Sequence, residues 1–178
     1  MKKLQNKLQE KLKNRKQNNK GFSLVELIIV IAIMAILVGI VGTQVIPYIE
    51  KSRKAKDIQV VSGLCTDAMT AYSSNAAKLD ANATYTITLT APTTGTAWGV
   101  AVDGGIAAEK TALQDAFTEL NNVNTTGLKF ESKAGKEIGT ITVTCQNTAP
   151  MISVQVAPKS GATTLTAANK DDFKVESN

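Results

Sequence analysis

Residues 20–54 read KGFSLVELIIVIAIMAILVGIVGTQVIPYIEKSRK and contain the most apolar run of the chain. Between Glu26 and Glu50 lie 23 residues without a charged side chain. An α-helix rises about 1.5 Å per residue, so roughly 20 apolar residues cross a hydrocarbon core of about 30 Å. The run from Leu27 to Ile49 is therefore long enough to form one membrane-spanning helix.

Glu26 lies at the edge of this run, within the sequence LVELIIV. A carboxylate at the centre of a bilayer costs about 2.5–3.5 kcal/mol, and residues of this kind usually have a partner or a function. Position alone leaves two interpretations open. Glu26 is either solvated among the lipid headgroups or paired with a positive charge.

The residues KGFSLVEL, followed by the apolar run, resemble the N-terminal signature of type IV pilins and related pseudopilins. In that family a basic leader ends in glycine, and the next residue, usually phenylalanine, begins the mature chain. A glutamate follows four residues later. The corresponding residues here are Gly21, Phe22 and Glu26, and the likeness covers about Lys20 to Asp57.

The resemblance implies that a membrane prepilin peptidase cleaves between Gly21 and Phe22 and methylates the new Phe22 amine. It also implies an assembly ATPase and a membrane platform protein as partners, and a homo-oligomeric helical filament as the product. In such a filament Glu26 of one subunit pairs with the Phe22 amine of a neighbour. The same spacing permits a pair within one chain, so this alternative stays open.

The charge of the chain is unevenly distributed. Eight of the 20 Lys and Arg residues lie in residues 1–21 beside one acidic residue, whereas the remainder holds 12 basic and 14 acidic residues. A basic flank of a membrane helix stays in the cytoplasm. We therefore expect residues 1–21 to be a cytoplasmic leader that is removed, and the rest to be exported. The overall charge of +5 belongs to this leader and predicts no specific nucleic-acid partner.

A single helix is predicted from Phe22 to Ala77, apolar all round in its first half and amphipathic in its second. Pro47 has no amide donor and clashes with the preceding turn, so it is expected to bend or loosen the helix. Many type IV pilins carry their proline one turn earlier, at the position of Thr43. The apolar residues of the second half recur at helical spacing: Val61, Cys65, Ala68 and Tyr72.

From Asn82 onward the pattern alternates with a period of two, which is typical of half-buried strands. An amphipathic helix is predicted over residues 106–122. The fold class is therefore α+β: a long N-terminal transmembrane and assembly helix packed on a small antiparallel head, the type IV pilin fold. Strands are predicted at 84–90, 97–102, 128–132, 137–145 and 151–157, with an edge strand at 172–176. The domains are 1–21 (leader), 22–49 (apolar helix), 50–80 (amphipathic helix) and 81–178 (head).

Two cysteines, Cys65 and Cys145, fall in the part predicted to be exported. Cys65 lies on the inward face of the helix, and Cys145 continues the inward set of its strand, Ile141 and Val143. An even cysteine count in an oxidising compartment favours a disulfide, which would join helix and sheet. The alternative is a pair of buried free thiols.

Catalytic and metal-binding signals are missing from the sequence. The chain has no histidine, the commonest general base and metal ligand, and no nucleophile elbow or phosphate-binding loop. Scattered aspartates (Asp103, Asp171 and Asp172) lack the fixed spacing of a calcium loop and are interpreted as solvated turns. We expect no enzyme activity and no cofactor or metal.

The sequence as a whole predicts a prepilin, the precursor of a type IV pilus subunit. It would be a single-pass protein of the cytoplasmic or inner membrane and, after assembly, part of a surface filament serving adhesion, motility or DNA uptake. Within the family, a minor pilin or a type II secretion or competence pseudopilin is the alternative. A membrane-anchored surface binding protein or enzyme is the alternative from another functional class.

Overall fold

The computed structural model describes Gln5 and residues 21–177. The predicted leader, residues 1–21, lies outside the described residues except for Gln5 and Gly21, so it stays a prediction. The chain divides into two compact units, residues 1–46 and 47–178, and each is described by itself.

The first unit contains helix α2 (Leu24–Ile40) and a π-helical segment, η1 (Val41–Val45). The residues of α2 are almost all apolar, and none of them is buried. Over half of these residues are β-branched Ile or Val, which have only modest helix propensity. A helix satisfies its backbone hydrogen bonds within the segment, as an apolar surrounding requires, while the exposure of its side chains leaves it without a covering surface. The apolar first half predicted from sequence is thus confirmed.

Segment η1 ends two residues before Pro47. Since Pro47 has no N–H, the carbonyl of Thr43 loses its usual helical donor. The Thr43 hydroxyl also donates to the carbonyls of Gly39 and Ile40, both at 3.3 Å, and such back-bonding tends to disturb a helix. The loosening predicted near Pro47 is therefore a π-helical segment. The helix does not break there, since the helical chain is continuous from Leu24 to Ser74.

The second unit begins on helix α3 (Ile46–Ser74), which ends three residues before the predicted Ala77. Its buried face contains the four residues predicted from helical spacing, so the amphipathic second half is confirmed. The buried residues of α3 are Asp57, Val61, Leu64, Cys65, Ala68, Ala71 and Tyr72.

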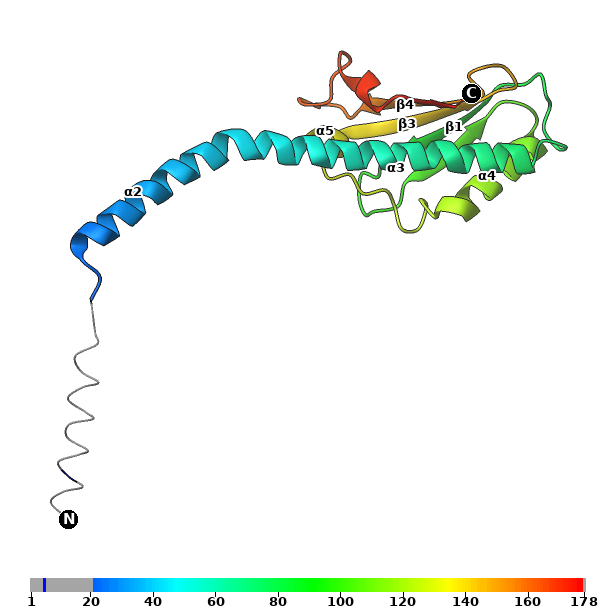
Figure 1. The fold of residues 1–178 in the computed structure, drawn as a ribbon. Coiled ribbons are helices and arrows are strands. Elements are labelled where there is room, and N and C mark those ends of the chain that lie inside the picture. The colour runs from blue at the N-terminus through cyan, green and yellow to red at the C-terminus, as the bar shows by residue number, and fades with distance from the viewer. Residues whose placement is uncertain (1–4, 6–20, 178) are drawn as a thin grey trace. The chain divides into compact units, whose positions relative to one another are not determined.

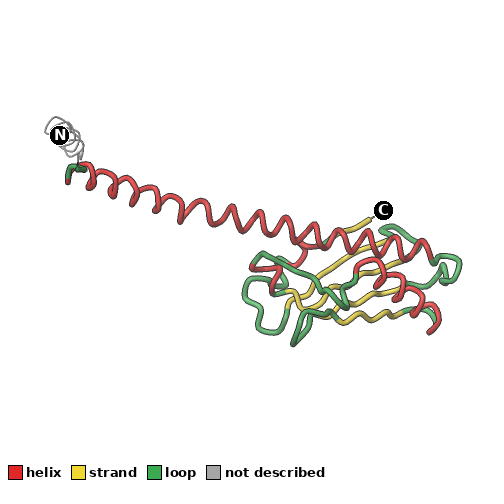
Figure 2. The backbone as a smooth tube through the Cα atoms, turned by 90° about the horizontal axis from the view of Figure 1, so that it is seen from below, coloured by secondary structure: helices red, strands yellow, loops and turns green. Residues whose placement is uncertain are grey.

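A five-stranded antiparallel sheet lies beside α3 (Figures 1 and 2). Its strand order is β2-β1-β3-β4-β5, and the α+β prediction is confirmed. Alternate residues of the central strands are buried, as the period of two requires. The strands are β1 (Tyr85–Thr90), β2 (Gly99–Asp103), β3 (Ile138–Cys145), β4 (Ile152–Pro158) and β5 (Val175–Ser177).

The hydrophobic core fills the space between the inner face of the sheet and the buried face of α3. On neighbouring strands β1 and β3, Leu89 pairs with Ile141 and Tyr85 pairs with Cys145, and all four side chains are fully buried. Helix α4 (Ala107–Asn121) confirms the predicted short helix and contributes Leu113 and Phe117 to the core. One contiguous core of this kind holds the head together as a unit.

Two predicted strands differ from the structure. Residues 128–132 form an irregular segment that leads into the short helix α5 (Lys133–Lys136), not a strand. The reason is that Asp57 of α3 accepts the backbone N–H groups of Glu131 and Ser132, which a strand would have placed in a ladder. The edge strand expected at 172–176 is shifted, because a 3₁₀ helix, η2 (Lys170–Phe173), precedes β5.

Glu137 organises the loop that follows β4, and it predicts a pH dependence. Hydrogen bonds from the amides of Leu165, Thr164 and Thr163 and from the Thr163 hydroxyl, the Leu165 amide first, lower the pKa of its carboxyl. A lowered folded-state pKa stabilises the protein above the ordinary value of 4.5, and this contribution disappears as the pH falls through the folded-state value.

We therefore expect Glu137→Gln to lower the urea midpoint of unfolding at neutral pH, and the difference from the native chain to shrink below pH 4.5. Fluorescence of Trp98 would follow the unfolding. A difference that stays constant across this pH range would contradict the assigned role of the charge.

Candidate processing and assembly site

The predicted cleavage junction lies just before α2. Gly21, Phe22 and Ser23 are outside the helix, and the Phe22 side chain is 91% exposed. A Cβ atom added to Gly21 would meet nothing within 4 Å. The fold itself therefore imposes no steric requirement for glycine at this position, and the peptide bond before Phe22 is accessible.

Ser23 and Glu26 form a capping box at the start of α2. The Ser23 hydroxyl accepts the Val25 amide at 3.4 Å, and Glu26 Oε2 accepts the Ser23 amide at 2.8 Å. These bonds satisfy N–H groups that a helix leaves free at its first turn. Glu26 thus already has a role within one chain that the sequence reasoning missed, although the pattern Ser-x-x-Glu before an apolar run was the signal for it.

The surface of α2 and η1 is the second part of the site. The described chain contains one helix that is long and apolar enough to cross a membrane. Water-exposed apolar surface costs roughly 25 cal/mol per Å², so a surface of this extent needs a cover of lipid or protein. The exposed apolar residues include Leu27, Ile28, Ile31, Met34, Leu37 and Val38.

The structure places Cys65 of α3 and Cys145 of β3 in the core as free thiols. Burial raises the pKa of both thiols, and burial together with negative charge on Cys65 raises the pKa of Cys145 to about 12. Both side chains belong to the same buried hydrophobic cluster. The predicted disulfide would join α3 directly to the sheet, and it stays a prediction.

We expect the exported chain to contain the Cys65–Cys145 disulfide. It would close a loop of about 80 residues and stabilise the head by about 4–4.5 kcal/mol in the chain-entropy model. Intact-mass analysis with and without reductant should show the loss of one hydrogen per cysteine. Thermal unfolding should be sensitive to reductant in the native chain and insensitive in Cys65→Ala. Equal masses under both conditions would favour the alternative of two buried thiols.

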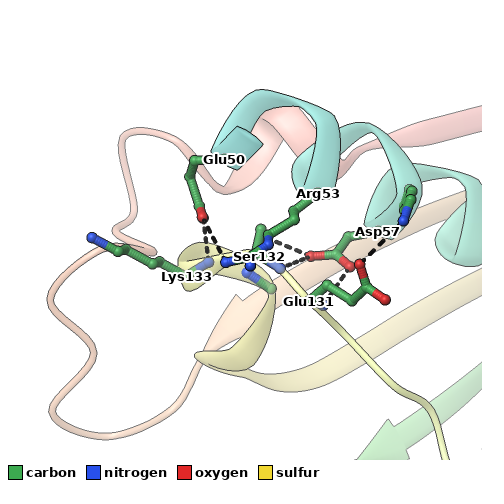
Figure 3. Close-up of polar contacts among 8 residues, drawn as sticks. Glu50, Arg53, Asp57, Glu131, Ser132 and Lys133 are labelled. Atoms are coloured by element: carbon green, nitrogen blue, oxygen red, sulfur yellow. Dashed lines mark hydrogen bonds and ion pairs between the residues drawn. The ribbon is translucent and has the colours of Figure 1, made fainter. Parts of the chain in front are cut away.

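Hydrogen bonds join α3 to the residues at the start of α5. We call Glu50, Asp57 and residues 131–133 the polar clamp. Glu50 accepts the Lys133 amide, and Asp57 accepts the amides of Glu131 at 2.8 Å and Ser132 at 2.9 Å (Figure 3). The Ser132 hydroxyl also donates to Asp57. Asp57 is 1% exposed, and these three hydrogen-bond donors satisfy its buried carboxylate.

The aspartates considered for calcium do not converge. Asp172 forms an ion pair with Lys54 of α3, and Asp103 lies 4.0 Å from Lys110. Asp172 therefore ties η2 to α3 and is not simply solvated. Among residues 21–177, no group of three His, Cys, Asp or Glu side chains is placed to hold a metal ion.

Comparison with known protein families finds one match. Residues 16–42 match the family model of the prokaryotic N-terminal methylation motif, the type IV prepilin-like signal. No curated protein and no solved structure matches the chain. The motif supports a type IV pilin-like or pseudopilin subunit, a family of structural and not enzymatic proteins. Together with the apolar helix, it supports membrane anchoring of the precursor.

Proposed function

We propose that this chain is a prepilin, which is cleaved between Gly21 and Phe22 and then assembled into a type IV pilus or a related filament. The observation that carries the proposal is the methylation motif at residues 16–42, joined to a helix whose apolar surface is bare in the single chain. Lipid would cover this surface in the precursor, and the helices of identical subunits would cover it in the filament.

Domain roles follow from this proposal. Residues 1–21 are the leader, 22–49 the membrane and filament-core helix, 50–80 the amphipathic support, and 81–178 the exposed head. The proposed partners are a prepilin peptidase, an assembly ATPase, a platform protein and further copies of the chain. The precursor resides in the membrane, and the filament extends from the cell surface in adhesion or motility.

Glu26 is proposed to pair with the methylated Phe22 amine of a neighbouring subunit. Its carboxylate has about four lone-pair sites, and one hydrogen bond, from the Ser23 amide, occupies Oε2. Acceptor capacity is left for a positively charged amine. Opposite charges attract more strongly in an apolar surrounding than in water, so the pair would set the axial register of the stacked helices.

N-terminal sequencing of the surface-exposed form tests the proposal most directly. We expect a mature chain that begins at N-methylphenylalanine, Phe22, and that is abundant in sheared filaments. A chain that begins at Met1 and stays in the membrane would contradict the proposal and favour an anchored surface protein. Correct processing with little material in filaments would instead favour a minor pilin or a pseudopilin, which share the motif.

A further inference from the structure

A basic groove opens on the head, with a volume of about 690 Å³. Its lining comes from α3, the loop after β1, the segment before α5, α5 itself and the residues after β4. Four cations from four different segments converge on it, and two aromatic side chains contribute to its wall. These six residues are Arg53, Lys129, Lys136, Lys159, Trp98 and Phe130.

Three of the four cations of this basic groove are unbalanced, whereas Arg53 lies 3.9 Å from Glu50 on the same helix. Among the described residues, Lys129, Lys136 and Lys159 have no carboxylate within 4.0 Å. The one acidic residue of the lining, Glu131, lies 3.4 Å from Lys56 and is engaged there. Residues 47–178 as a whole hold 12 basic and 13 acidic residues. The positive charge is therefore concentrated at the groove and is not a general property of the head.

The groove lies close to the end of the apolar run along α3. Ile49 is the last residue of that run, and Arg53 follows it by four residues on the same helix. Four residues correspond to about 6 Å of helix rise. The headgroup layer on each side of a bilayer is roughly 5–7 Å thick. When the apolar run spans a membrane, Arg53 is therefore held at the level of the lipid headgroups.

We propose that the basic groove binds the anionic headgroups of the membrane in which the precursor is anchored. The proposal rests on membrane anchoring and not on filament assembly. Lysines close to an anionic leaflet each contribute about a fivefold gain in binding. Docking would hold the head against the bilayer until the subunit is extracted, and the groove would become free when the apolar run leaves the lipid.

A lipid surface fits the groove better than a soluble polyanion does. Because Arg53 of the groove follows the apolar run by only four residues, anchoring of the chain gives the headgroups a high effective concentration. Single-stranded nucleic acid needs exposed aromatic faces for base stacking, whereas Trp98 is only 5% exposed and packs edge-on against Phe130. The apolar portions of the wall are instead compatible with the interfacial region of a bilayer.

Trp98 is the single tryptophan of the chain, so its fluorescence reports on the groove alone. The full-length chain would be reconstituted in phosphatidylcholine vesicles with and without phosphatidylglycerol, and Trp98 would be quenched by headgroup-spin-labelled lipid. We expect stronger quenching in the anionic vesicles and a decrease with added salt. Lys129→Gln, Lys136→Gln and Lys159→Gln together should reduce the docked-to-undocked ratio roughly 100-fold, which removes the difference between vesicles.

A matched variant controls for charge alone. Lys78→Gln, Lys110→Gln and Lys170→Gln remove the same charge from positions outside the groove lining, and quenching should remain as in the native chain. Equal quenching in both kinds of vesicle, or equal loss in both triple variants, would overturn the proposal. Soluble glycerol phosphate, polygalacturonate and single-stranded DNA would be added separately. Displacement by glycerol phosphate at low concentration would show a phosphate site, and displacement by either polymer a polyanion site, each overturning a membrane-surface role.

Discussion

Glu26→Val is expected to abolish filaments while export and cleavage at Gly21 continue. The substitution removes the proposed partner of the Phe22 amine, and it leaves an unpaired charge in an apolar bundle, which is costly. It also removes the acceptor of the Ser23 amide, so we expect an additional loss of about 1 kcal/mol of helix stability. Electron microscopy of sheared surface material, with immunoblots of the processed chain in membranes, would measure both outcomes.

Glu26→Gln separates the two roles of this residue. Glutamine serves as well as glutamate in a capping box, so the contact with Ser23 is kept while the charge is lost. If pairing between subunits is the important role, Glu26→Gln should be as deficient in filaments as Glu26→Val. Normal filaments from Glu26→Gln would assign Glu26 to capping alone. Ser23→Ala, which weakens the cap but keeps the carboxylate, should assemble filaments.

Asp57→Ala is expected to destabilise the head by about 3–5 kcal/mol. The substitution leaves the buried amide and hydroxyl of Ser132 and the part-buried amide of Glu131 without their acceptor, and each unsatisfied buried donor costs about 1–3 kcal/mol. Gly135 packs directly against this carboxylate, since an added Cβ atom would clash with Asp57 Oδ2. Thermal unfolding of the full-length chain, followed by circular dichroism, would measure the change.

Asp67→Ala is the matched control on the same helix. Asp67 is partly exposed, and burial raises the pKa of its carboxyl. No side-chain hydrogen bond or ion pair involves Asp67 among the described residues, so its removal leaves no donor without an acceptor and should change stability by no more than about 0.5 kcal/mol. If both variants unfolded together with the native chain, the polar clamp would have no part in joining α3 to α5.

The long helix and most of the sheet could be predicted from the sequence because both depend on periodicity. Val61, Cys65, Ala68 and Tyr72 repeat at helical spacing and are all buried. The alternating pattern of residues 138–145 likewise reappears as β3. Patterns of this kind record which face is buried, and burial is what such reasoning detects.

Features that depend on long-range polar contacts could not be predicted in the same way. Residues 128–132 have strand-like composition, but Asp57, more than 70 residues earlier, takes their amides. Lys129 and Lys159 likewise reach one groove from distant segments. The candidate site could be proposed from sequence because Gly21, Phe22 and Glu26 are neighbours in the chain, and their roles in processing and pairing stay predictions. The capping partner Ser23 was overlooked.

The capping box has a consequence for maturation, because both of its members lie downstream of the proposed scissile bond. Loss of the leader would break no hydrogen bond that begins the helix, so the processed subunit need not refold at its new end. In the new N-terminus, Phe22 alone would precede the capping residue of α2. Its amine would then be presented at a nearly fixed distance from the first helical turn, ready for the next copy.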